Sequence, residues 1–280
     1  MKSKNPRKNM PNINKIINLG LTLIATSAIG YIALDSWLSK KSEITNEQTQ
    51  INLEQKCLSQ ELREAIKDPK KRQTYLDRLL TNASMPFVST VIYDSEGKKL
   101  VDYLRALAEA RGIANEDLES SLEETKRIAL KGEFDAKTPE IFDFSGEGIK
   151  PPIFIGKKLF TGQYSDLEIR TCIYAHEARH AEQIALGLER LGYLKKETIL
   201  KAIKTGEIPQ AVLYGVCEID AMNSELTELE KVQTTINTEY YNRVLTNYRV
   251  SRRILEINIR KTQGNLRELL IKTLEVNPKR

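Results

Sequence analysis

The chain has 280 residues, which is enough for one large domain or two modest ones with a substantial core. Hydrophobic residues make up 40% of it and charged residues 29%, values that exclude a wholly disordered chain and a multi-span membrane protein. Three cysteines are too few for a disulfide scaffold, and two histidines exclude any site that needs three.

The net charge of +5 is unevenly distributed along the chain. Residues 1–15 contain five basic residues and no acidic residue, and residues 243–280 contain ten basic and three acidic residues. The remainder, residues 16–242, is therefore acidic. Because the bulk of the chain is acidic, we expect no broad nucleic-acid-binding surface. The basic residues near the C-terminus are typical of a solvated helix face, with a protein partner or an anionic lipid surface as the alternative.

An uncharged run of 19 residues, 16–34, follows the basic start. A helix of this length just spans the hydrocarbon core of a bilayer. We therefore expect residues 16–38 to be a transmembrane signal anchor, with the basic arm 1–15 in the cytoplasm and the rest of the chain outside it. The alternatives are a cleaved signal peptide, with cleavage among the small residues 25–28, and an ordinary buried helix. The first two interpretations both export the protein.

Residues 55–131 are predicted to be a helical N-terminal region that follows a polar linker at 39–54. Pro69 is expected to separate two helices within 55–82, because proline cannot continue the first. The next predicted elements are a strand at 87–93 and helices at 98–111 and 115–131.

Residues 132–231 are predicted to form the central region of the chain, followed by long amphipathic C-terminal helices with a basic tail at 232–280. Short strands joined by turns are expected within 133–161, where hydrophobic residues alternate with glycine and proline. Ser165 and Glu168 have the spacing of a capping box, which predicts the start of a helix that runs to about residue 186. The predicted fold class is therefore α+β, mainly helical, with a short strand region before this helix.

Residues 176–180 read His-Glu-Ala-Arg-His and lie inside the capped helix. Histidines four positions apart lie one above the other on one helix face, so His176 and His180 are expected to bind one zinc ion. Glu177 lies beside that face, where a carboxylate can accept a proton from water without being a ligand. The alternative is a pair of core or exposed histidines without a metal. Apolar neighbours indicate a buried helix, in which two histidines need polar partners.

A catalytic zinc site needs a third protein ligand and an open position. Glu218 is the best candidate, because it lies among apolar residues 38 positions after His180. This spacing leaves room for a turn, a short helix at about 195–204 and a returning helix. Asp220 and Glu225 are the alternatives for the third ligand. Asp220 is also our candidate to hold the outer nitrogen of a ligand histidine, which is the ring nitrogen that does not bind the metal.

The HEARH helix, followed by the segment CEIDA at 217–221, resembles the zincin metallopeptidases, specifically the gluzincin type. The resemblance covers roughly residues 133–231 and implies a zincin-like catalytic core. It implies that His176, His180 and Glu218 bind Zn²⁺. It also implies that Glu177 is the general base in the hydrolysis of a peptide or protein substrate.

The resemblance also bears on the surroundings of the site. It implies an edge strand that lines the substrate cleft, for which residues 151–160 are the candidate. Many gluzincins have Asp or Asn four residues after the third ligand, where this chain has Met222. Tyr214 is a candidate to stabilise the oxyanion, with a packed core tyrosine as the alternative. Cys172 and Cys217 are expected to be small buried residues, with a disulfide or a role as a zinc ligand as the alternatives.

The sequence thus predicts a membrane-anchored or exported zinc metallopeptidase. The main alternative is a non-enzymatic, membrane-anchored helical scaffold with an inactive or structural metal site, whose C-terminal helices bind a protein partner. A different zinc-dependent hydrolase on the same scaffold is a third possibility, because a fold does not determine a substrate.

Overall fold

The computed structural model describes residues 58–110, 116–132, 134–139, 150–188, 194–195, 210–232 and 238–259. These parts are mainly helical, with a small sheet, in agreement with the predicted fold class. None of the helices in these ranges is long and apolar enough to cross a membrane. The basic arm, the predicted anchor at 16–38 and the linker at 39–54 lie outside the described residues, as does nearly all of the helix expected at about 195–204.

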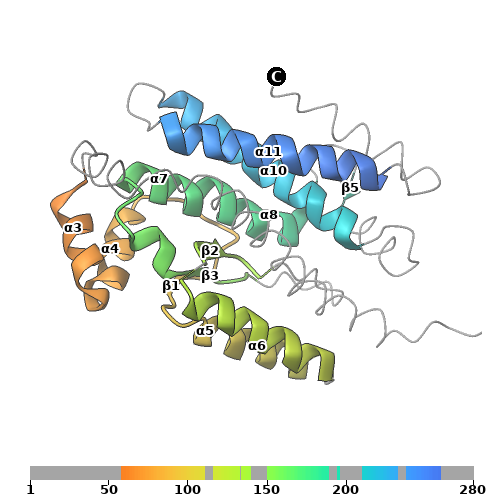
Figure 1. The fold of residues 1–280 in the computed structure, drawn as a ribbon, viewed down its shortest axis with the longest axis horizontal. Helices are drawn as coiled ribbons and strands as arrows, with labels where there is room; N and C mark the ends of the chain where they lie inside the picture. The colour runs from red at the N-terminus through yellow and green to blue at the C-terminus, as the bar shows by residue number, and fades with distance from the viewer. Residues whose placement is uncertain are drawn as a thin grey trace, which may run out of the picture.

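Two short helices begin the described part of the chain (Figure 1). The first, α3 (Gln60–Lys67), is capped by the side chain of Ser59. Pro69 then starts the 3-10 helix η1 (Pro69–Lys71), which leads directly into α4 (Arg72–Leu79). The predicted separation at Pro69 is confirmed, because proline has no N–H to continue the hydrogen bonding of α3.

The sheet has three short strands: β1 (Val91–Tyr93), β2 (Ala136–Lys137) and β3 (Ile153–Ile155). Their order is β1-β3-β2, with β3 parallel to β1 and antiparallel to β2. β1 is shorter than the strand predicted at 87–93. The expectation that residues 151–160 supply an edge strand is wrong. All of β3 is buried and it pairs on both sides, so among the described strands β2 forms the edge beside the motif helix.

A helical pair covers one face of this sheet (Figure 1). It consists of α5 (Lys98–Ala110) and α6 (Glu116–Leu130), which lie close to the predicted bounds. Gly97 precedes α5 with φ +68°, and a Cβ there would lie 2.4 Å from the side chain of Ala129. Glycine is therefore needed both for the backbone conformation and for the close approach of α6. A hydrophobic cluster joins α5 and α6 to Phe154 of the sheet.

The motif helix lies on the other side of the sheet, after the short 3-10 helix η2 (Lys157–Phe160). Its parts in chain order are α7 (Asp166–Thr171), the π-helical segment η3 (Cys172–Glu177) and α8 (Ala178–Leu186). The capping box is confirmed: Ser165 caps the backbone of Glu168 at 3.3 Å, and the Glu168 carboxylate accepts from the Ser165 N–H at 2.7 Å. After α8, β4 (Gly187–Leu188) pairs with β5 (Leu194–Lys195).

Two long helices complete the fold, α10 (Gln210–Lys231) and α11 (Thr238–Ile259), which lie side by side (Figure 1). A Cβ at Gly215 would lie 3.2 Å from Leu255, so the small residue allows α11 to approach α10 closely. α10 also packs against η3 and α8. It therefore lies between α11 and the motif helix, and this placement brings Glu218 to the two histidines.

Candidate metal centre

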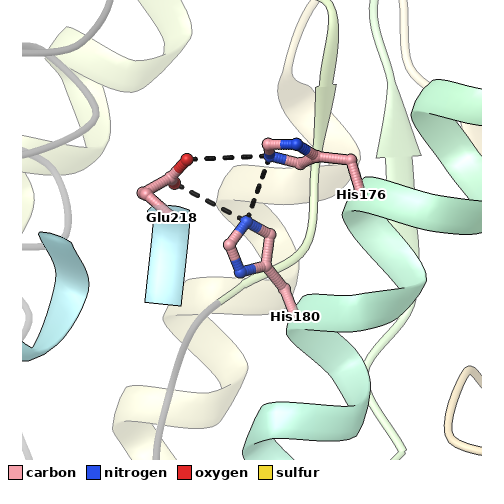
Figure 2. Close-up of side chains that lie close together, drawn as sticks. All are labelled: His176, His180 and Glu218. Carbon is pink, nitrogen blue, oxygen red and sulfur yellow. Dashed lines mark hydrogen bonds and ion pairs between the residues drawn. The ribbon is translucent and has the colours of Figure 1, made fainter. Parts of the chain in front are cut away.

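Three side chains from two helices converge at one point (Figure 2). His176 lies in η3, His180 in α8 and Glu218 in α10. The Nε2 atoms of the two histidines are 3.2 Å apart. Each carboxylate oxygen of Glu218 faces one imidazole: Oε2 is 3.6 Å from Nε2 of His176, and Oε1 is 3.6 Å from Nε2 of His180. The structure thus brings together the three residues predicted to bind zinc.

The backbone that carries His176 is not a regular α-helix. The segment η3 is π-helical, and such short π-helical segments occur frequently at functional sites. The two imidazoles still meet, with ring centroids 4.9 Å apart and planes at 76°. The sequence analysis predicted a continuous α-helix here, because residue periodicity does not distinguish a single π-helical turn from an α-helical one.

The outer nitrogen of His176 is held by Glu225. Nδ1 of His176 lies 3.1 Å from Oε2 of Glu225, and Oε1 of the same carboxylate accepts a hydrogen bond from the hydroxyl of Tyr240. Glu225 is on α10 and Tyr240 on α11, so both C-terminal helices support this histidine. The sequence analysis weighed Glu225 only as a ligand. Its position seven residues after Glu218, two helical turns along the same face, is the signal that indicates this role.

The outer nitrogen of His180 is held by Gln183, which the sequence analysis missed. Nδ1 of His180 lies 2.9 Å from Oε1 of Gln183. The amide nitrogen of Gln183 donates to the backbone oxygen of Cys217 at 3.0 Å and to Asp220 at 2.7 Å. Asp220 also accepts from Nε of the buried Arg179 at 2.7 Å. Asp220 was expected to hold a histidine itself. Instead, its described contacts reach His180 only through Gln183.

These partners determine which tautomer each imidazole adopts. Glu225 offers a carboxylate oxygen to His176. Gln183 presents its amide oxygen to His180, because its amide nitrogen donates to Cys217 and Asp220. Both partners therefore accept, so Nδ1 carries a proton in His176 and in His180. In two neutral imidazoles, the Nε2 lone pairs would then face each other across 3.2 Å. Two facing lone pairs repel, so the arrangement requires a cation, either a proton or a metal ion.

The local charges agree with this requirement. Burial alone would lower the pKa of His176, but hydrogen bonds to Glu218 and Glu225 outweigh burial and raise the pKa well above its usual range. Burial alone would raise the pKa of Glu218, but the charges of His180, His176 and Lys137 lower it. The carboxylates of Glu218 and Glu225 therefore form an anionic cluster that favours a positive charge at His176.

Glu177, the predicted general base, is directed toward the sheet and is 5% exposed. Its Oε2 accepts a hydrogen bond from the backbone N–H of Thr138 at 2.6 Å. The hydroxyl of Thr138 donates to the backbone oxygen of Glu177 at 2.9 Å. Thr138 directly follows β2, so two hydrogen bonds join the motif helix to the edge of the sheet.

The sequence analysis also singled out two cysteines and a tyrosine near the site, Cys172, Cys217 and Tyr214. No disulfide joins Cys172 and Cys217, and burial raises the pKa of the Cys172 thiol well above its usual range. Cys217 is the small buried residue that the sequence analysis expected, Cys172 is only half-buried, and the disulfide alternative is wrong for this structure. The side chain of Tyr214 lies outside the described part, so its predicted contact with an oxyanion stays a prediction.

No protein-family model, curated protein or solved structure matches this chain.

Proposed function

We propose that the protein is a zinc-dependent metallopeptidase of the gluzincin-like zincin type. The observation that carries the proposal is the convergence of His176, His180 and Glu218 on one point. Two histidines, one carboxylate and an open position form the donor set of catalytic zinc sites that hydrolyse peptide bonds. Because both histidines have their outer nitrogens held, their Nε2 lone pairs are already directed at the site.

The spacing of the donor atoms supports a small tetrahedral ion. Zinc bonds of about 2.0–2.1 Å in a tetrahedron separate neighbouring ligand atoms by about 3.3–3.4 Å. The distances between His176, His180 and Glu218 are 3.2, 3.6 and 3.6 Å. An ion of this size would therefore need only small movements of the side chains. Calcium, which prefers six to eight oxygen ligands at longer distances, fits this nitrogen-rich set poorly.

The roles of the residues follow from their positions. Zinc, when bound, lowers the pKa of a coordinated water and polarises the carbonyl group of the substrate. Glu177 accepts a proton from the attacking water and donates it to the leaving amine nitrogen. Its Oε2 is held by Thr138, which leaves Oε1 to handle the proton. Glu225 and Gln183 keep the ligand imidazoles in their tautomers and orientations.

The sheet provides a place for an extended substrate. In the sheet formed by the described residues, β2 is an edge strand that packs against η3, the segment that carries His176 and Glu177. A peptide that pairs with an edge strand gains backbone hydrogen bonds independent of its side chains. We infer that the substrate is an extended peptide segment bound along β2. From the sequence alone, we also propose that residues 16–38 anchor the protein in a membrane, with the catalytic region outside the cytoplasm or exported.

The test is a comparison of the wild-type protein with Glu177→Gln. Glu177 makes no metal contact in the proposed site, so the variant should keep a full complement of zinc. Loss of the base should reduce cleavage of fluorescently labelled casein at least on the order of 10²-fold, because general acid–base catalysis contributes about 10²–10⁴-fold. Glu228→Gln on α10, whose carboxylate pairs with Lys231 at the surface, is the matched control. Equal metal content with no cleavage by the wild type would instead favour the non-catalytic scaffold.

A further inference from the structure

We propose that Thr138 is a positioning residue that sets the Glu177 carboxylate in register with the strand that receives the substrate. This inference rests on the proposed peptidase function and goes beyond it, because it identifies how the substrate strand and the base are coupled. Thr138 reaches the proposed reaction only through Glu177, whose carboxylate and backbone oxygen it holds.

The two hydrogen bonds of Thr138 hold Glu177 at both of its polar ends. The backbone N–H of Thr138 fixes Oε2 of the carboxylate, and the hydroxyl fixes the backbone oxygen of the same residue. Thr138 is 0% exposed, so no water competes for either bond. A hydrogen bond from N–H to an ionised carboxylate is short and strong, as the 2.6 Å distance indicates. The carboxylate therefore has little freedom to rotate.

Because Thr138 directly follows β2, its contact with Glu177 connects the sheet to the proposed general base. In this strand, Ala136 and Lys137 pair with Ile155 and Phe154 of β3. A peptide paired with β2 is therefore tied through Thr138 to Glu177. Because the side-chain and backbone spacing of a strand is fixed, this connection determines which peptide bond of the substrate faces the base.

The need for such a contact comes from the motif helix. Glu177 is the last residue of the π-helical segment η3, where the regular α-helical pattern is interrupted. This interruption of the regular helix coincides with the residue that Thr138 holds. Thr138 supplies an external restraint from a different layer of the fold at this residue.

The test compares Thr138→Val, which keeps the shape and the backbone N–H but removes the hydroxyl, with Thr138→Ser, which keeps the hydroxyl. Thr171→Val is the matched control, because Thr171 is also buried and its hydroxyl donates to a backbone oxygen of the motif helix, that of Leu167, at 2.8 Å. We expect Thr138→Val to bind zinc normally and to lower kcat on labelled casein on the order of 10- to 100-fold, with KM unchanged. Thr138→Ser should restore most of kcat, and Thr171→Val should retain wild-type kcat.

A second readout does not depend on activity. In the full-length wild-type protein, the amide proton of Thr138 should give a strongly downfield NMR signal, because it binds a carboxylate. Glu177→Gln should move this signal upfield, while the signal of Leu100, whose amide donates to Asp94, should not move. This readout holds even if Thr138→Val fails to fold.

The inference is overturned if Thr138→Val keeps kcat within about twofold of wild type, or if the Thr138 amide signal is unchanged by Glu177→Gln. In either case, cleavage by the wild type that Glu177→Gln abolishes would leave the proposed peptidase function standing. A wild-type protein without bound metal or cleavage would overturn both.

Discussion

Glu225 contacts Nδ1 of His176, the ring nitrogen that points away from the metal centre. Its carboxylate accepts the Nδ1 proton at 3.1 Å, while Nε2 of the same ring faces Glu218. Glu225 is 4% exposed, and its Oε1 accepts a hydrogen bond from the hydroxyl of Tyr240. A carboxylate in this position fixes the tautomer of the histidine and makes the imidazole a stronger ligand.

Glu225→Gln should weaken zinc binding while the fold is preserved. An amide can still contact Nδ1 but lacks the negative charge, and changes to such outer partners typically reduce metal affinity about 10–100-fold. Competition with a fluorescent zinc chelator measures the affinity. Glu228→Gln, one turn further along α10, should bind zinc as wild type does. Equal affinities for both variants would show that Glu225 does not support the site.

Gln183→Met should affect both metal binding and stability. The substitution removes the acceptor of the His180 Nδ1 proton, so we expect about a tenfold loss of zinc affinity. It also removes the donor to Asp220 and to the Cys217 oxygen, at a cost of about 1–3 kcal/mol in the free energy of unfolding. Urea denaturation measures the second effect. Gln60→Met, at an exposed glutamine of α3, is the control and should change neither quantity.

Removal of the metal should lower the melting temperature. A ligand present at 100 times its Kd stabilises the folded state by about 2.7 kcal/mol, which corresponds to roughly 5–10 °C for a domain of this size. Calorimetry with and without EDTA measures the shift. His176→Ala should melt at a temperature that EDTA does not change. If EDTA has no effect on the wild type, the metal does not contribute to the folded state.

Arg179→Met should be strongly destabilising, because Arg179 is a buried cation between two acids. It pairs with Asp220 and with Glu182, both at 2.7 Å. Removal of one member of a buried ion pair costs about 3–5 kcal/mol, since the other charge is left without compensation. In contrast, Arg78→Met removes an exposed pair with Glu61 and should cost less than about 1 kcal/mol. Similar losses in urea denaturation would contradict this account of the buried network.

Local signals in the sequence predicted much of the fold. Pro69 and the capping box at Ser165 act on their immediate neighbours, so their effects appear in the structure where they were expected. The strands were harder to place. β2 has two residues, too few to show an alternation of apolar and polar side chains. Its place in the sheet depends on pairing with β3, which is distant in the sequence.

The sequence also indicated the candidate ligands but not their supports. His176 and His180 share a motif, and Glu218 has an apolar environment that suggests a buried helix face. The residues that hold the site in place come from separate elements. Tyr240 on α11 donates a hydrogen bond to Glu225, and Thr138 beside the sheet donates one to Glu177. These contacts join residues 15 and 39 positions apart, so helical periodicity does not reveal them.

The most direct test of the central claim is the metal content of the purified full-length protein, measured by mass spectrometry beside His176→Ala and Glu177→Gln. The account predicts about one zinc ion per chain in the wild type and in Glu177→Gln, and its loss in His176→Ala, because His176 is a ligand and Glu177 is not. A folded wild-type protein that holds no zinc after zinc is added, or a His176→Ala variant that keeps it, would contradict the account.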